Sequence, residues 1–230
     1  MILSAHQPQF MPWLGYFDKM AKCDLFVILD NVQFKRNEWQ NRNKLLSSDG
    51  WQWLTVPVLH DFGQNIDEVP ANNTVPWRKK HPRTIAQVYS RRPGFAEVMP
   101  LVEGMYAKPW DKLCAVNMHS IEMLRSLLGV GTKLEFSSRH KIEGMSTQRL
   151  VNLCKYFGAD TYLSGPGGHD YMDMGLFEQA GIKVIFHEYT HPVYPQQGKE
   201  FIPYMAALDM AFQLGPAKAK ELFAQGLCAN

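Results

Sequence analysis

Polar side chains that could do chemistry follow each of five apolar segments in this sequence. His6 and Gln7 come first, and Asp30 follows the second segment. The other candidates lie in the loop after Asp30 or beyond the remaining segments: Gln33, Arg36, Arg42, Ser138, Arg139, Ser164, Gly165, Gly167, Gly168, His169 and Glu188. Histidine and carboxylates act as general bases, whereas arginine side chains and glycine-rich turns bind anions. These residue types predict a site that holds an anionic group and moves a proton.

The five apolar segments must position these side chains. They cover residues 2–5, 24–30, 133–136, 161–163 and 182–186. The second is a continuous apolar run, which is typical of a parallel strand buried on both faces. A predicted helix at 13–22 joins the first two segments with the spacing of a βαβ unit. Because ligands bind beyond the carboxyl ends of the strands in an open parallel sheet, we expect the five polar loops to converge there.

The rest of the chain predicts further helices and one extended segment. Helices are expected after Pro93 and Gly94 and at 83–92, 111–128, 146–157, 176–180, 201–213 and 217–225. Ser146 is the expected N-cap of its helix, residues 31–43 form a polar loop, and residues 51–58 are extended. The prediction is an α/β fold: a mostly parallel, nucleotidyltransferase- or Rossmann-like sheet with helices on both faces, plus a helical block. Residues 1–230 form one domain, with a helical insertion or subdomain at about 78–130.

The segment from His6 to Gly15 follows the first strand and leads into a helix. A polar turn at that place brings His6 and Gln7 close to the free backbone N–H groups of the first helical turn. A histidine needs only a modest pKa shift to serve as a base near neutral pH. We therefore place His6 at the centre of the predicted site.

A glycine-rich turn, Gly165-Pro166-Gly167-Gly168, follows the fourth strand. Its backbone N–H groups could hold a phosphate or a carboxylate. The turn matches neither the dinucleotide-binding pattern nor the P-loop, which needs a Lys-Ser/Thr pair. An anion cradle and a plain tight turn both remain open.

Residues 187–191, His-Glu-Tyr-Thr-His, formally match the zinc motif His-Glu-x-x-His. That motif requires both histidines on one helical face, four residues apart. Here it follows an apolar strand, contains Thr190 and runs into Pro192, so we place it on a strand end and a loop. No metal site is predicted, and Glu188 is expected to act in the crevice without zinc.

Composition limits the class of protein. The chain has 230 residues, a formal net charge of +2 and 46% hydrophobic residues, so it can bury a core, and its charge gives no reason to expect a nucleic-acid partner. A basic run at 78–83 is either a solvated helix face or an anion contact. Prolines interrupt every long apolar run near the N-terminus, so no membrane insertion is expected. The expected location is the cytoplasm. The four cysteines, Cys23, Cys114, Cys154 and Cys228, are widely spaced and are expected to be reduced.

The motifs together identify a family. They are the His6–Phe17 segment, Val32-Gln33-Phe34, Asn41-Arg42-Asn43, Thr55–Val58, Tyr162–Gly168 and His191-Pro192-x-Tyr194-x-Gln196. In this order, and over nearly the full length, the sequence resembles the WbqC-like family. That family is associated with bacterial surface-polysaccharide (O-antigen) gene clusters, which implies a nucleotide-sugar or other small-molecule substrate.

The opening βαβ is also similar to the start of pantothenate synthetase, an adenylate-forming amide ligase of the nucleotidyltransferase-like fold. In that family two histidines flank a glycine at the helix start. Trp13-Leu14-Gly15-Tyr16 stands there in this chain, so the adenylating pair is absent, and the cofactor, ATP or another, stays open. The shared fold is the firmer implication.

Two hypotheses follow from these residues and resemblances. The first is a transferase or ligase that modifies an amino-sugar precursor by amide or acyl transfer. His6 is its general base or a phosphate contact, Asp30 and Glu188 orient or deprotonate the amine, and the anion contacts come from the Gly165–Gly168 amides and three arginines: Arg36, Arg42 and Arg139. The second is a non-catalytic module that binds a nucleotide-sugar or a glycan in the same crevice. The sequence leaves the oligomeric state open.

Overall fold

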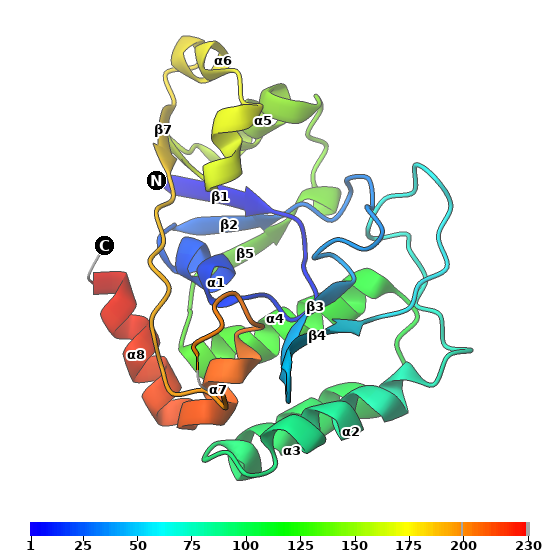
Figure 1. Cartoon of the computed structure of the whole chain (residues 1–230). Coiled ribbons are helices and arrows are strands. Elements are labelled where there is room, and N and C mark those ends of the chain that lie inside the picture. The colour runs from blue at the N-terminus through cyan, green and yellow to red at the C-terminus, as the bar shows by residue number, and fades with distance from the viewer. Residues whose placement is uncertain (199, 229–230) are drawn as a thin grey trace.

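In the computed structural model the five apolar segments form one sheet in which every pair of neighbouring strands is parallel (Figure 1). The strand order is β5-β2-β1-β6-β7, with β1 at Ile2–His6, β2 at Leu25–Ile28, β5 at Lys133–Phe136, β6 at Thr161–Ser164 and β7 at Lys183–Phe186. The structure describes residues 1–198 and 200–228, and at Cys228 only the backbone. The predicted parallel sheet is confirmed.

Helices cover both faces of this sheet, as predicted. Within the described residues they are α1 Leu14–Ala21, α2 Trp77–Tyr89, α3 Phe95–Ala107, α4 Leu113–Leu128, α5 Ser146–Phe157, α6 Met174–Gln179, α7 Leu208–Leu214 and α8 Pro216–Cys228. Two short 3-10 helices follow strand ends, at Ser137–Arg139 and Pro166–Asp170. Figure 1 shows α5 and α6 on one side of the sheet, and the other helices on the opposite side.

Side-chain alternation along β2 separates the two faces. Leu25 and Val27 pack in a core with residues of α5 and α6, whereas Phe26 and Ile28 join the larger core formed with the remaining helices. Successive side chains of a strand point to opposite faces, so an unbroken apolar run buries both. The sheet is therefore the middle layer of the molecule.

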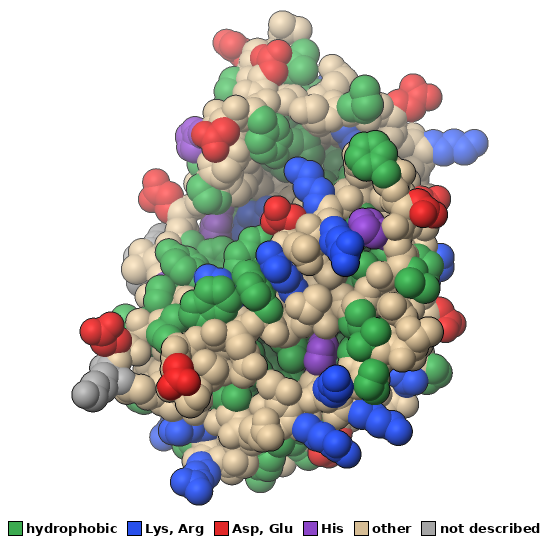
Figure 2. Space-filling model, turned by 45° about the vertical axis from the view of Figure 1, so that its right-hand side comes forward, with side chains coloured by type: hydrophobic (Ala, Val, Ile, Leu, Met, Phe, Trp, Pro, Cys, Tyr) green, Lys and Arg blue, Asp and Glu red, His purple; other side chains and the backbone are tan. Residues whose placement is uncertain are grey.

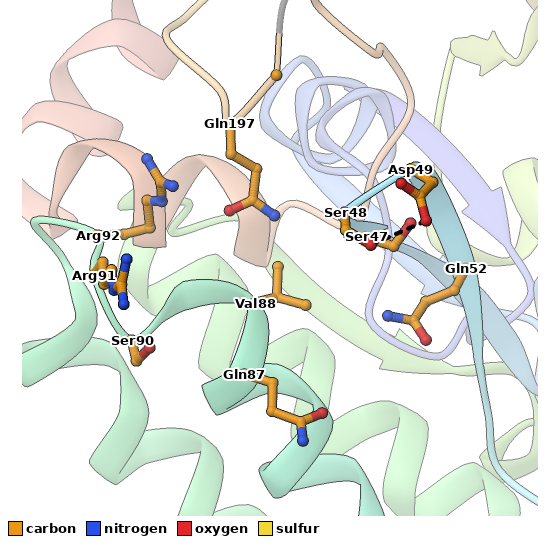
Figure 3. A pocket seen from close by; sticks show the side chains of 11 residues that line it. Ser47, Ser48, Asp49, Gln52, Gln87, Val88, Ser90, Arg91, Arg92 and Gln197 are labelled. Atoms are coloured by element: carbon orange, nitrogen blue, oxygen red, sulfur yellow. Dashed lines mark hydrogen bonds between the residues drawn. The ribbon is translucent and has the colours of Figure 1, made fainter.

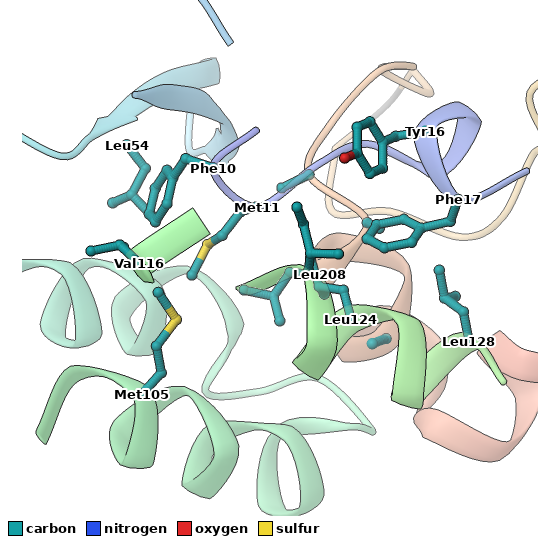
Figure 4. Close-up of a cluster of buried hydrophobic side chains, with 14 of the residues drawn as sticks. Phe10, Met11, Tyr16, Phe17, Leu54, Met105, Val116, Leu124, Leu128 and Leu208 are labelled. Carbon is teal, nitrogen blue, oxygen red and sulfur yellow. The ribbon is translucent and has the colours of Figure 1, made fainter. Parts of the chain in front are cut away.

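The loop between β1 and α1 fills the larger core instead of lying on the surface. Phe10 and Met11 are fully buried and pack near Met105 of α3, Val116 of α4 and Leu208 of α7 (Figure 4).

Side chains from elsewhere in the chain hold the backbone of this loop. Asn43 Nδ2 donates to the Met11 carbonyl at 2.8 Å, Asn117 Nδ2 donates to the Pro8 carbonyl at 3.0 Å, and Ser120 Oγ accepts from the Met11 N–H at 3.0 Å. This part of the opening motif therefore has a structural role.

Chain order changes direction beside β1. The chain passes from β1 to β2 and β5 on one side, and then returns to place β6 and β7 on the other side. The β1/β6 pair is therefore the topological switch point, where open α/β sheets bind ligands.

Three helices, α2, α3 and α4, form where the helical block was predicted, and their apolar residues belong to the same core as α1. The organisation as one domain with an insertion stays a prediction.

A two-stranded antiparallel hairpin, β3 Arg42–Ser47 and β4 Gly50–Thr55, lies apart from the main sheet. Only its second strand was expected, because β3 begins with polar residues and its extended form depends on pairing with β4.

Two helix predictions were wrong in extent. The helix expected to begin at Arg83 begins at Trp77 and continues through Pro82, because Trp77, His81, Ile85 and Tyr89 form a continuous buried stripe. The helix expected from residue 201 begins only at Leu208. Tyr204 has a φ of 64°, a left-handed conformation that a helix cannot contain. Ser146 is the first residue of α5 and not its cap, which is Met145.

Cys23, Cys114 and Cys154 are free and buried, as expected, and burial raises the pKa of each thiol to about 12. The side chain of Cys228 lies outside the described residues. In the part of the chain that the structure describes, no helix has the length and apolar character needed to cross a bilayer.

Candidate functional site

A crevice of about 310 Å³ opens at the switch point between β1 and β6. It is lined by Ala5, His6, Gln7, Lys19, Leu29, Leu150, Tyr162, Ser164, Gly165, Pro166, Gly167, Gly168 and Tyr171. The space-filling view shows a recess below α5 and α6 with histidine and basic side chains inside it (Figure 2). Six residues predicted from the sequence meet here: His6, Gln7, Ser164, Gly165, Gly167 and Gly168.

Lys19 contributes the positive charge of the crevice. Its side chain rises from α1, is 4% exposed, and donates from Nζ to the Ala5 carbonyl at 3.1 Å. Among the described residues no carboxylate lies within ion-pair distance of this ammonium group. Burial lowers the pKa of Lys19 to about 8. A buried ammonium that makes a single hydrogen bond and lines a cavity is a strong attractor for a ligand anion.

His6 ends β1 and shares the crevice with Lys19. Its Nδ1 lies 3.1 Å from the Gln7 carbonyl, which can only accept, so Nδ1 carries the proton and Nε2 is the basic nitrogen. Burial, aided by the Lys19 charge, lowers the pKa of His6 to about 3. This shift is much larger than the modest one expected from the sequence. A bound anion would reverse it, because negative charge favours the protonated forms of both groups.

The glycine turn closes the crevice on the β6 side. The Gly168 N–H donates to the Gly165 carbonyl at 3.0 Å, and Pro166 has no N–H. The amides of Gly165 and Gly167 are therefore the turn's candidate donors to an anion. Ser164 Oγ donates to the Gly165 carbonyl at 3.0 Å and lies 3.2 Å from Met172 Sδ, which fixes the base of the turn.

Replacing Gly168 with alanine is expected to lower the free energy of unfolding by about 1–3 kcal/mol. A Cβ atom there would lie 2.1 Å from Ser164 Oγ and 2.8 Å from Met172 Sδ, so the turn must shift. Gly167→Ala is the matched control, because a Cβ at that position meets nothing within 4 Å. Urea unfolding of both variants measures the difference. Equal stability of the two variants would contradict this account of the turn.

Asp30 follows β2, which lies on the side of β1 away from β6, and its side chain contacts the residues after β5. Its carboxylate accepts from the Ser138 N–H at 3.0 Å and from the hydroxyls of Ser137 and Ser138 at 3.1 Å and 2.6 Å. The neighbouring Asn31 bonds to Ser137 and to Arg149 of α5. Asp30 therefore ties the end of β2 to the end of β5, and neither it nor Ser138 lines the crevice.

Glu188 and His169 also lie at the carboxyl edge of the sheet but outside the crevice lining. Glu188 is exposed, and the His169 ring stacks on Phe186 with centroids 3.4 Å apart. The segment that follows β7 is not helical, as predicted, so the zinc geometry of His-Glu-x-x-His does not form. His187 is buried, with Nε2 3.4 Å from Asp18 Oδ2.

The remaining four predicted residues lie on other elements, with Arg139 in the short 3-10 helix after β5 and Arg42 at the start of the hairpin strand β3. Gln33 and Arg36 are exposed on the loop after β2. The Arg139 guanidinium lies over the Phe136 ring at 4.6 Å, and that of Arg42 lies over Trp53 at 4.0 Å. None of these four lines the crevice.

The start of α1 does not fit the adenylating histidine pair. Trp13 folds over Gly15, where a Cβ would lie 2.2 Å from the indole, and its ring packs on Tyr189 and Tyr204 at 5.2 Å and 5.3 Å. Aromatic packing fills the place where such histidines would project. Among the described residues no cluster of His, Cys, Asp or Glu could hold a metal ion.

The sequence-based reasoning missed Lys19, Tyr162 and Tyr171, all of which line the crevice. Local spacing did not single out Lys19, because Lys22, its neighbour one turn away, is also charged, as is usual on a surface helix face. Tyr162 lies inside its strand, and no spacing rule indicates it.

Comparisons with known proteins agree over nearly the whole chain. A model described as "WbqC-like protein family" matches residues 7–221. A Mycobacterium tuberculosis protein described as "Uncharacterized protein Rv1507c" is 34% identical over 213 residues, covering 91% of this chain and 92% of that protein. The search of solved structures found no match.

Proposed function

This chain belongs to the WbqC-like protein family, and from that premise we propose that it is a transferase or ligase acting on a nucleotide-linked amino sugar by amide or acyl transfer. The substrate's phosphate groups bind in the crevice at the β1/β6 switch point. The amine to be modified lies near His6.

The observation that carries this proposal is the charge of Lys19. A buried ammonium without a carboxylate partner is costly in an empty crevice, and an anionic ligand relieves that cost. The amides of Gly165 and Gly167 add donors in the lining of the same crevice. A diphosphate linking a nucleoside to a sugar supplies the charge and acceptor oxygens for both.

His6 supplies the proton acceptor. In the proposed reaction the sugar amine attacks the carbonyl carbon of an activated donor, the C–N bond forms, and the donor's leaving group departs with its bonding electrons. The proton lost by the amine passes to His6 Nε2. The bound diphosphate raises the pKa of His6 from its low value, so the base becomes effective only when substrate is present.

One observation favours the alternative, a non-catalytic module that binds a nucleotide-sugar. The crevice lining contains no carboxylate, because Asp30 is engaged beside β5 and Glu188 is exposed outside the lining. His6 is the only histidine in the crevice lining and has no carboxylate beside it there, and its pKa is lowered to about 3.

A titration calorimetry and mass spectrometry experiment tests both readings. The intact protein is titrated with a UDP-linked amino sugar, the corresponding free sugar and UDP, and then incubated with the UDP-sugar and activated acyl donors. We expect the UDP-sugar and UDP to bind and the free sugar not to bind, and a product heavier by the acyl group to form. Binding without product under every donor supports the module, and absence of UDP-sugar binding refutes both.

A further inference from the structure

The hairpin and the loop before it carry a partly exposed array of rings and cations that the crevice does not use. We call it the tryptophan–cation ladder: Trp39, Arg42, Lys44, Trp51 and Trp53. Trp51 and Trp53 are 42% and 38% exposed. Their ring centroids lie 5.2 Å apart, and that of Trp39 lies 5.6 Å from that of Trp53.

The cations of the ladder are held by the rings. The Arg42 guanidinium lies 4.0 Å from the Trp53 centroid, and Lys44 Nζ lies 4.4 Å from that of Trp51. Neither cation has a carboxylate within ion-pair distance among the described residues, and the buried Arg42 Nε lacks a hydrogen-bond partner. Arg42 and Lys44 are two residues apart on β3, so their side chains leave the same face of the strand and place two positive charges on it.

Strand geometry puts the ladder on one face of the hairpin. Lys44 pairs with Trp53 in the antiparallel register, and Trp51 follows on the same side. Gln52 lies on the opposite face and points with Gln87 into a separate polar pocket of about 770 Å³ (Figure 3). The Phe10 N–H donates to the Trp39 carbonyl at 3.1 Å, which ties the ladder to the loop after His6.

We propose that the tryptophan–cation ladder binds an acidic saccharide, meaning a chain of sugar rings that bear carboxylates. Indole surfaces pack against the C–H faces of sugar rings, and the two unpaired cations complement the carboxylates. This inference does not depend on the chemistry proposed for the crevice.

Ring orientation and charge favour a saccharide over single-stranded nucleic acid. Successive bases stack on rings that are roughly parallel, but here the interplanar angles are 82° and 59°. Cations already cover one face of Trp51 and one of Trp53. Nucleic-acid binding also depends on a track of many basic residues, whereas this chain has a net charge of +2 and the ladder has two cations.

Fluorescence titration of the full-length protein tests this inference with three probes: trigalacturonic acid, neutral maltotriose and an oligothymidylate. We expect trigalacturonic acid to quench tryptophan emission and bind at least tenfold more tightly than maltotriose, with an affinity that falls as salt is added. Trp51→Ala and Lys44→Gln should each weaken this binding about tenfold, confirmed by calorimetry. Both side chains lie on the surface ladder, and circular dichroism checks the fold.

Phe62→Ala is the matched control, because Phe62 is an aromatic side chain that is 100% exposed on another loop. It should bind trigalacturonic acid as the wild type does. Equal affinity for the acidic and neutral saccharides overturns the role of the cations, and tighter binding of the oligothymidylate overturns the ligand class. Lys19→Met should leave binding of trigalacturonic acid to the ladder unchanged. A result that contradicts the ladder proposal can therefore be told apart from one that contradicts UDP-sugar binding in the crevice.

Discussion

Replacing Lys19 with methionine is expected to weaken the binding of a UDP-linked sugar by about 30-fold to 4,000-fold. Removing one partner of a buried charge pair costs roughly 2–5 kcal/mol, and each 1.4 kcal/mol is a tenfold change in affinity. Methionine has a similar length and is apolar, so the cavity keeps its volume while its charge is lost. Titration calorimetry of wild type and variant at pH 7 gives the ratio.

The same variant should unfold less readily in the absence of ligand. Burial lowers the pKa of Lys19 from 10.5 to about 8, which means that the folded state holds the charged form at a cost. Each unit of pKa shift corresponds to about 1.4 kcal/mol, and the lost bond to the Ala5 carbonyl offsets part of the gain. We expect the free energy of unfolding to rise by about 2 kcal/mol at pH 7.

The pH dependence of stability tests independently whether the charged form of Lys19 destabilises the folded protein. Between pH 8 and 10.5 the unfolded chain keeps the Lys19 proton while the folded protein has lost it. At Lys19 the unfolded state then binds more protons, so this residue contributes a rise in stability with pH in that window, opposite to the fall contributed by the three buried thiols, whose pKa values are raised to about 12. Lys19→Met should lack this rise. Lys155→Met, which removes an exposed lysine of α5, should retain both the rise and the affinity.

Loss of affinity together with loss of stability would mean that Lys19 serves the fold alone. An unchanged affinity for the UDP-sugar would place the anion elsewhere. The combination of weaker binding and greater stability is the result that a structural role does not produce, because a structural ammonium stabilises the chain that contains it.

Local patterns were sufficient to predict the central sheet. The unbroken apolar run Leu25–Ile28 indicates a strand buried on both faces, and the polar residues directly after each strand mark the carboxyl edge. Long-range packing decided the rest. Residues 201–207 looked helical, but Gln196 binds both backbone groups of Ile202, and Tyr204 adopts a positive φ, so that segment stays irregular.

Which predicted residues line the crevice depends on the order of the strands in the sheet, and the sequence does not reveal that order. His6 and the glycine turn meet because β1 and β6 are neighbours. Asp30 follows β2, whose other neighbour is β5, so its oxygens find Ser137 and Ser138 instead. Lys19 resembles any surface lysine on a helix until the sheet is placed above α1. A polar residue after a strand is therefore a candidate, and its neighbour in the sheet decides what it contacts.

Replacing His6 with glutamine is expected to lower kcat for acyl or amide transfer by roughly 10²-fold to 10⁴-fold, the range for loss of a general base. Glutamine is neutral and polar, as His6 is in the free protein, so the crevice keeps its charge. If His6 acts as a base, the Kd for the UDP-sugar stays nearly constant. If it is only a phosphate contact, Kd rises and kcat at saturation is retained.

A pH profile separates these roles further. With substrate bound, the wild-type rate should increase as pH rises through the pKa of His6 in the complex, and the His6→Gln profile should be flat there. His60→Gln, which alters a histidine packed on Phe34, should keep the wild-type profile. Acid unfolding gives a readout independent of activity. Because the pKa of His6 is about 3 when folded and 6.5 when unfolded, wild-type stability falls as pH drops through that interval, and the variant should lose less.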